Sequence, residues 1–301
     1  MKKMFRRASR ALLPLLLGSA AAGSAALPAA RLPDAEPAMW MVKDKDTTIY
    51  LFGTFHALDG KTDWFNDEVR AAFDASQDVV LEIITPDDPA ALRPALIKHA
   101  FDKSGRTLTS KLSPAGRTAL AASLKRHGMP ATALDQFKPF FASLTLATLE
   151  FGKLGLGSGH GSEEVIKKAV KGSTKKLGAV ETVDEQLGML NALPEAEQIR
   201  LLESALAESD AMGPEIRAML AAWNRGDAAA VAAMIQKSDT DSPALFKLMF
   251  TDRNARWTQW VNQRLATPGT VFLAVGAGHL AGDRSVVAML KRQGRRVSRI
   301  Q

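Results

Sequence analysis

Residues 47–56, TTIYLFGTFH, share their pattern with residues 270–279, TVFLAVGAGH. In both segments a run of β-branched and apolar residues predicts a strand, and a histidine follows three residues after the glycine that ends the run. A glycine at this point lets the chain turn sharply as it leaves the sheet. The pattern therefore predicts two related strand–GxxH units. These bring His56 and His279 to the carboxyl edge of one sheet, where open α/β sheets usually bind ligands.

Further strands are expected around this pair. Residues 39–42 and 47–52 flank a polar segment and predict a hairpin, and the continuous apolar run at 79–84 is typical of a strand buried on both faces. The closing unit is expected to be a strand at 270–275, a helix at 279–292 and a strand at 296–300. Between these units, residues 89–266 predict helices interrupted by one strand at 176–180. The predicted fold class is α/β, with a central sheet and a large helical insertion (about 89–266) in a domain of residues 38–301.

The first 29 residues predict a secretory signal peptide. Five basic residues precede an apolar stretch at 11–17, and small residues continue through position 29. The apolar stretch is shorter than the roughly 20 residues that span a bilayer, and the small residues place cleavage between Ala26 and Ala30. We therefore expect an exported protein, periplasmic or secreted, with no membrane span after signal removal. A leader retained as an N-terminal anchor is the alternative.

The composition limits the classes of site. The formal net charge is +7, but the leader carries five of the basic residues and no acid, so the remainder is near +2. This modest excess does not favour nucleic-acid binding. Because the chain has no cysteine, a metal site would have to use histidine and carboxylate ligands.

Two glutamates stand at expected strand positions. Glu82 lies in the middle of the apolar run 79–84, where an isolated carboxylate costs several kcal/mol unless it is paired or bound to a metal. Glu181 lies between an expected strand and a helix that begins with the capping-box residues Thr182 and Glu185. Both glutamates are candidate site residues. The alternatives are a structural ion pair for Glu82 and a favourable helix-dipole contact for Glu181.

Arg253 and Asn254 fall on the apolar face of their expected helix, four residues from Met249 or Trp257 and from Phe250 respectively. A buried guanidinium requires an anionic partner. If that partner is Glu82 or Glu181, the arginine belongs to the site; if it is Asp252 or Glu208, it is a structural tie. An arginine that extends its charged end to solvent is a further alternative.

The remaining histidines give weaker signals. His99 and His127 lie in Lys/Arg-rich helical stretches and are expected to be exposed. His160 lies in a glycine-rich loop whose ending does not match a phosphate cradle. Glu163 and Glu164 after that loop either begin a helix or reach the site. The chain contains neither the Gly-x-Ser-x-Gly elbow of serine hydrolases nor the HExxH helix of zincins.

The motifs GTFH, VVLEI, AVETVDEQ, an RN..W helix and GAGH, in this order from about Trp40 to the end, resemble the TraB/GumN family, which includes the Tiki proteases that act on Wnt. The resemblance implies a divalent-metal site formed by His56, His279, Glu82 and Glu181, with Arg253 and Asn254 nearby. The family's Gly-x-Asp element is replaced here by Gly161-Ser162-Glu163. Such ligands suit Zn, Mn, Co or Fe.

The resemblance also implies hydrolysis of a peptide or protein substrate. One glutamate would complete the metal site and the other would act as general base, with Arg253 holding a substrate oxygen. Two alternatives remain open. The pocket could hold a metal, haem or small ligand without turnover, or the GxxH units could be structural turns only.

Overall fold

The computed structural model describes residues 32–301, apart from the side chains of residues 237–241. The expected signal peptide, residues 1–29, lies outside the described residues. In the described part of the chain, every helix is too short or too polar to cross a bilayer.

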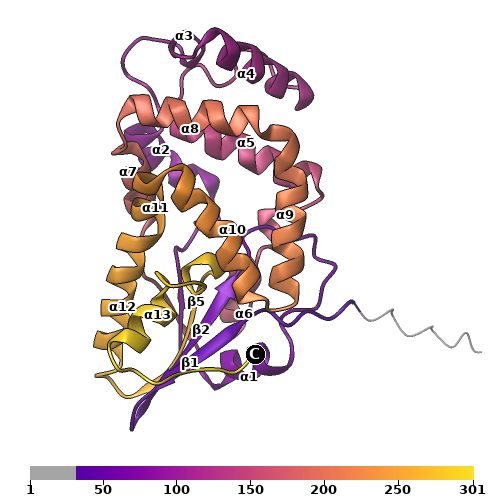
Figure 1. The fold of residues 1–301 in the computed structure, drawn as a ribbon. Helices are drawn as coiled ribbons and strands as arrows, with labels where there is room; N and C mark the ends of the chain where they lie inside the picture. Colours follow the sequence, from indigo (N-terminus) through magenta and orange to yellow (C-terminus); the bar gives the residue numbers. More distant parts are fainter. Residues whose placement is uncertain (1–31) are drawn as a thin grey trace, which may run out of the picture. The chain divides into compact units, whose positions relative to one another are not determined.

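A six-stranded sheet confirms the predicted α/β class (Figure 1). The four strands β4, β3, β5 and β2 are parallel neighbours, whereas β1 pairs antiparallel with both β2 and β6. The sheet order is β4-β3-β5-β2-β1-β6. The strands are β1 (Met39–Lys43), β2 (Thr47–Thr54), β3 (Asp78–Leu81), β4 (Lys176–Ala179), β5 (Gly269–Gly276) and β6 (Val297–Arg299).

Helices cover both faces of this sheet. One apolar layer joins Leu51 and Leu273 to Trp257 and Val261 of α12, and the other joins Phe52 and Phe272 to α1 and α6. A separate core holds α3, α4, α5 and α8 together, at the end of the molecule away from the sheet (Figure 1). The longer helices are α1 (Asp67–Ala75), α2 (Arg93–His99), α4 (Pro114–Arg126), α5 (Pro139–Lys153), α6 (Ser162–Lys171), α7 (Val183–Asn191), α8 (Glu195–Ala207), α9 (Ser209–Asn224), α10 (Ala228–Asp241), α12 (Asp252–Arg264) and α13 (Val286–Arg292). The short ones are α3 (Leu108–Lys111), α11 (Pro243–Phe246), and the single turns η1 (Pro89–Leu92), η2 (Ser158–His160), η3 (Lys247–Thr251) and η4 (Ala277–His279).

Two expected elements are shorter than predicted. The strand predicted at 79–84 ends at Leu81, so Glu82 follows β3 rather than lying inside it. The Gly276 amide donates to the Glu82 carboxylate, and no strand pairing continues between β3 and β5 beyond Leu81. The helix predicted at 279–292 starts at Val286, because Gly282 turns the chain with φ +83° and Ser285 provides the N-cap.

Candidate functional site

Four adjacent strand ends supply the predicted site residues. β2 and β5 pair in parallel with Thr54 opposite Gly276, so His56 and His279 leave the same edge of the sheet. Glu82 follows β3 on the other side of β5, and Glu181 follows β4 beyond it. His56 and His279, which lie on either side of the helical insertion in the sequence, therefore meet the two glutamates at one edge of the sheet.

The guanidinium of Arg253, from α12, ties this group together. It donates to Glu82 Oε1 at 2.5 Å, to Glu181 Oε2 at 2.7 Å and to His279 Nε2 at 3.1 Å. The central carbon of the guanidinium, Cζ, lies 4.7 Å from the centroid of the Trp257 ring, and only 2% of Arg253 is exposed. The predicted anionic partner is thus both glutamates, and the expectation that Arg253 is buried is confirmed.

A local irregularity helps to place Arg253. The segment η3 forms one π-helical turn immediately before α12, and the Met249 carbonyl in it accepts a hydrogen bond from Arg253 Nη1 at 3.1 Å. Such turns widen the helix and are frequent at functional sites. Here the turn provides an extra acceptor for a buried cation.

Both histidines present Nε2 to the site because Nδ1 is engaged by an oxygen. The His56 Nδ1 lies 2.6 Å from Glu163 Oε1, and the His279 Nδ1 lies 2.7 Å from Asn254 Oδ1. Asn254 is oriented by its own donation to the Arg284 carbonyl, so its oxygen faces the imidazole. The same oxygen-held arrangement orients most metal-ligating histidines in proteins.

These donors converge above Gly276. A side-chain carbon on Gly276 would lie 3.3 Å from His56 Nε2, 3.4 Å from Glu82 Oε2 and 3.5 Å from His279 Cδ2. A methyl group here would press on His56 Nε2 and would meet Glu82 and His279 at ordinary contact distances, so a larger side chain would fill the space between the two histidines and Glu82.

The two glutamates differ in availability. Glu181 accepts from Arg253 and Gln186, and also from Arg256 and Trp257, so both oxygens are occupied. By contrast, the Oε2 atom of Glu82 has one described partner, the Gly276 amide. Glu82 alone of the pair lines the cavities described below.

The electrostatics separate the two histidines. Burial lowers the pKa of His279 to about 3, whereas the charge of Glu163 raises the pKa of His56 to about 9. Burial also acts to raise the pKa of Glu82, but His279 and Arg253 outweigh it and hold that pKa well below its usual range. At neutral pH the metal-free site thus contains an ionised Glu82, a neutral His279 and a protonated His56, which would have to lose its proton to bind a metal.

We expect these differences to appear in an NMR titration of the metal-free protein. The His279 imidazole should show no titration between about pH 5 and 8, and the His56 imidazole should lose its proton only near pH 9. The folded-state pKa of His56 exceeds its ordinary value of 6.5, so its contribution to stability is full below that pH and is lost as the pH rises through about 9.

Solvent limits the size of this contribution. The side chain of His56 is 67% exposed, so water screens its pair with Glu163 and we expect roughly 1 kcal/mol or less. Glu163→Gln should remove the pH dependence in this interval, as measured by urea unfolding. If the variant lost stability between pH 6.5 and 9 as the parent does, Glu163 would not control this titration.

Two contributors were not assigned from the sequence. Glu163, whose role was left open between helix start and site, bonds His56 and also Thr54. Gln186 of α7 donates to Glu82 at 2.8 Å and to Glu181 at 3.1 Å. The sequence did hold one sign of this role. Gln186 follows the capping-box residue Glu185, so it lies near the start of a helix that begins beside Glu181.

Expectations for two other histidines were wrong. His99 is 7% exposed and bonds Asp184, and His127 is largely buried against Glu150. Lys/Arg-rich neighbours in sequence point to solvent from other faces of each helix, so they did not predict the exposure of the histidine. Both pairs lie outside the cluster at the strand ends.

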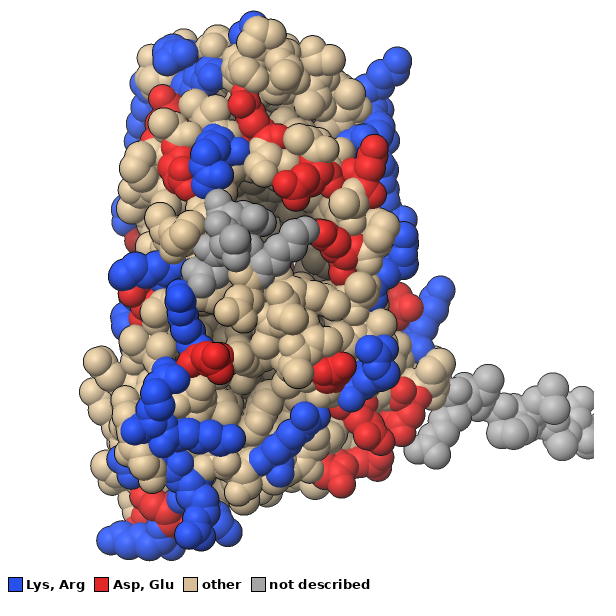
Figure 2. All heavy atoms as spheres, viewed as in Figure 1, with Lys and Arg blue, Asp and Glu red and all other residues tan. Residues whose placement is uncertain are grey.

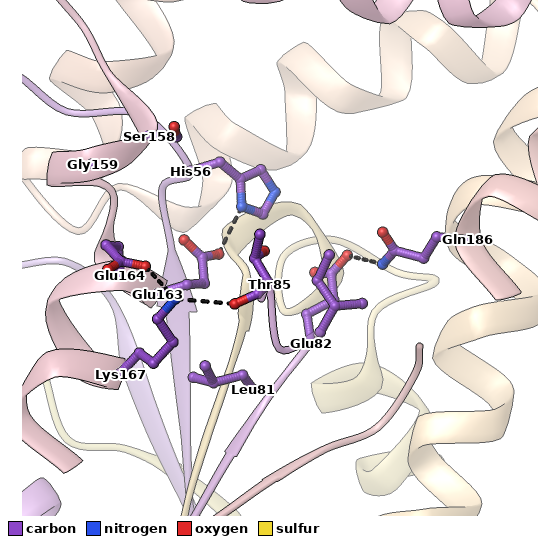
Figure 3. A pocket seen from close by; sticks show the side chains of 11 residues that line it. His56, Leu81, Glu82, Thr85, Ser158, Gly159, Glu163, Glu164, Lys167 and Gln186 are labelled. Carbon is purple, nitrogen blue, oxygen red and sulfur yellow. Dashed lines mark hydrogen bonds and ion pairs between the residues drawn. The ribbon is translucent and has the colours of Figure 1, made fainter. Parts of the chain in front are cut away.

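Two cavities meet at the cluster. A polar cavity of about 380 Å³ is lined by side chains that include His56, Glu82, Glu163, Glu164 and Lys167 (Figure 3). An apolar cavity of about 580 Å³ extends from the same His56 and Glu82 toward α5, α7, α9 and α10. The potential reacting groups therefore stand between two spaces of different character.

The donor set fits a divalent cation in its chemistry but not yet in its arrangement. His56 Nε2 and Glu82 Oε2 face one point, and the third donor atom, His279 Nε2, accepts a hydrogen bond from Arg253. Accordingly, among the described side chains of residues 32–236 and 242–301, no three His, Asp or Glu form a ready metal-binding group. Arg253 would have to release His279 for the set of three to form.

Comparison with known proteins agrees with the arrangement of these motifs. The model of the TraB/PrgY/gumN family matches residues 38–299. The chain belongs to this family. Among its relatives, "Uncharacterized protein YbaP" of Escherichia coli (strain K12) is 27% identical over 154 residues, which cover 50% of this chain and 54% of YbaP.

A second relative covers more of the family domain. An "Uncharacterized protein" of Treponema pallidum (strain Nichols) is 20% identical over 298 residues, covering 94% of this chain and 88% of its own. The match to YbaP spans only about half of that protein. No solved structure matches the chain.

Proposed function

We propose that this family member is an exported metal-dependent hydrolase that cleaves peptide bonds. The observation that carries the proposal is the convergence of His56 Nε2, Glu82 Oε2 and the His279 ring above Gly276, between two cavities. Carboxylate and imidazole groups at the carboxyl edge of parallel strands are a common basis for such sites. The peptide substrate follows from the resemblance to the Tiki proteases.

A metal ion would be held by His56, Glu82 and His279, and when bound it would supply a Lewis acid that polarises the scissile carbonyl. Glu163 and Asn254 hold the two imidazoles with Nε2 toward the site. Arg253 would stabilise negative charge on the carbonyl oxygen through the donor that it frees when it releases His279. Hydrolysis places the water's hydroxyl on the carbonyl carbon and delivers a proton to the leaving amine nitrogen.

The occupancy of the carboxylates suggests how the two glutamates divide their work. Glu181 is saturated by donors, so we assign it the role of positioning Arg253 rather than the general-base role. Glu82 combines an available oxygen with a low pKa and is the carboxylate that faces a ligand. Gln186 bridges the two and fixes their separation.

One observation favours a second function, a binding protein without turnover. Arg253 already neutralises Glu82 and Glu181 and occupies His279 Nε2. If this arrangement persists with ligand bound, the pocket recognises a ligand without activating water. Binding of a metal by His56, Glu82 and His279 together therefore distinguishes the hydrolase from the binding protein.

Titration of the metal-free protein with Zn²⁺ or Mn²⁺ by calorimetry tests the proposal. We expect one ion per chain, bound about 10–100-fold more weakly by Glu163→Gln, because that glutamate orients a ligating histidine. Glu164→Gln is the matched control, since Glu164 lines the same cavity but pairs with Lys167 instead of His56. Absence of binding, or equal weakening in both variants, would refute a metal site at His56.

A further inference from the structure

The two cavities that meet at the cluster have opposite chemical character. The apolar cavity is walled mainly by aliphatic, aromatic and methionine side chains that include Phe55, Leu144, Phe151, Met219 and Trp223. Its volume of about 580 Å³ lies in the range of sites that enclose ligands. The thioethers of methionine adapt to ligands of different shape, so this wall suits a class of large apolar groups rather than one molecule.

The polar cavity carries an excess of negative charge. Three carboxylates, Glu82, Glu163 and Glu164, line it together with two cations, Lys167 and the protonated His56 (Figure 3). That lysine, Lys167, is already bound: its ammonium lies 2.7 Å from Glu164 and 3.0 Å from Asp87, and it donates to the Thr85 carbonyl. Each carboxylate is paired as well, Glu82 with Arg253, Glu163 with His56 and Glu164 with Lys167, but the lining holds one more carboxylate than cations and so favours a basic over an acidic group.

We propose that the substrate is a peptide with a large apolar side chain in the apolar cavity and a basic group in the polar cavity, on opposite sides of the cleaved bond. This inference rests on the proposed hydrolysis. Both cavities are lined by His56 and Glu82, so a chain that occupies both must pass the reacting groups. The apolar cavity would bury the apolar side chain of the peptide. The carboxylates of the polar cavity would bind the basic group on the other side of the cleaved bond.

The same charges disfavour a lipid. A fatty acid or an anionic phospholipid could fill the apolar cavity, but its head group would then face Glu82 and Glu163. The buried cations beside the two cavities are already engaged: Arg253 by two carboxylates and a histidine, and Lys167 by Glu164 and Asp87. An uncharged or basic peptide meets neither obstacle.

Equilibrium binding of four fluorescent peptides tests the inference. Each peptide carries a reduced, uncleavable bond at its centre, with leucine or serine on one side and lysine or glutamate on the other. We expect the leucine–lysine peptide to bind the metal-loaded protein at least about ten-fold more tightly than the serine–lysine or leucine–glutamate peptides. Because no bond is cleaved, this preference is measured whether or not the protein turns over its substrate.

Two variants assign each preference to its cavity. Leu144→Trp narrows the apolar cavity at a position that is 41% exposed and should reduce the preference for leucine about ten-fold, whereas Ile97→Trp, at an exposed position outside both cavities, should not. Glu164→Gln should reduce the preference for lysine over glutamate, whereas Glu68→Gln on the exposed start of α1 should not.

The outcomes separate this inference from the proposed hydrolysis. Equal binding of the four peptides, or tighter binding of oleate than of the leucine–lysine peptide, would overturn it. So would preferences that the Leu144 and Glu164 variants leave unchanged. If the peptides show the expected preferences but the matching natural peptides are not cleaved, the two subsites are supported and only the proposed hydrolysis is refuted.

Discussion

Glu82→Gln is expected to slow peptide hydrolysis by at least about 100-fold, because it removes a proposed metal ligand and even residues that only orient ligands cost roughly 10–100-fold when mutated. Glutamine keeps the side-chain volume and an oxygen for the Gly276 amide. It removes the negative charge whose oxygen faces His56 above that glycine. Arg253 keeps Glu181 as its ionic partner, so the fold should persist.

The measurement is the cleavage rate of the leucine–lysine peptide with a natural bond, followed by mass spectrometry, together with circular dichroism of each variant. Glu164→Gln serves as the control at saturating peptide, where weaker binding of the lysine no longer limits the rate, because it removes a carboxylate from the same cavity without touching the cluster. A Glu82 variant with the parent rate would exclude Glu82 from the chemistry. A similar loss in the Glu164 variant would show that only the cavity's charge matters.

Arg253→Met is expected to lower the free energy of unfolding by about 3–5 kcal/mol, the usual cost of removing one partner of a buried ion pair. The variant leaves Glu82 and Glu181 with side-chain exposures of 9% and 3% and without the cation that they share. It also removes the contact with the face of Trp257. Methionine fills much of the arginine's volume, so uncompensated charge rather than a cavity should dominate the loss.

Urea unfolding measures this effect. Arg264→Met, near the end of the same helix, is the matched control: its partner Asp78 is partly exposed, and we expect a loss of about 1 kcal/mol or less. Adding Glu181→Gln to Arg253→Met should restore part of the stability by removing one stranded charge. Equal losses at Arg253 and Arg264 would mean that the cluster contributes no more than a surface pair.

The sheet and the strand-end residues were accessible from sequence because they depend on short patterns. The paired GxxH units predicted that both histidines lie at the carboxyl edge of one sheet, and the position of Arg253 on an apolar face required a buried anion. Glu163 and Gln186 were harder to assign. Their partners lie 107 and 104 residues away, and only the folded helical segments decide which side chain reaches which.

Other features depend on contacts between segments that are distant in the sequence, and a single sequence does not show these contacts. Glu82 appeared to interrupt a longer strand, but its side chain accepts the Gly276 amide where strand pairing ends. The apolar cavity is formed by side chains from α5, α7, α9 and α10, none of which carries a recognisable motif. Packing between distant helices therefore shapes the part of the site that would select a ligand.

The central position of β5 has a consequence for assembly of the protein. Among the described strands, β5 alone links the β3–β4 pair to the strands β2, β1 and β6, although it begins after nearly nine-tenths of the chain. Before it inserts, His56 and Glu82 belong to separate sheet fragments that have no common edge. Closing so long a loop is entropically costly and slows folding. The cluster is thus completed late, when the last parallel strand joins the two fragments.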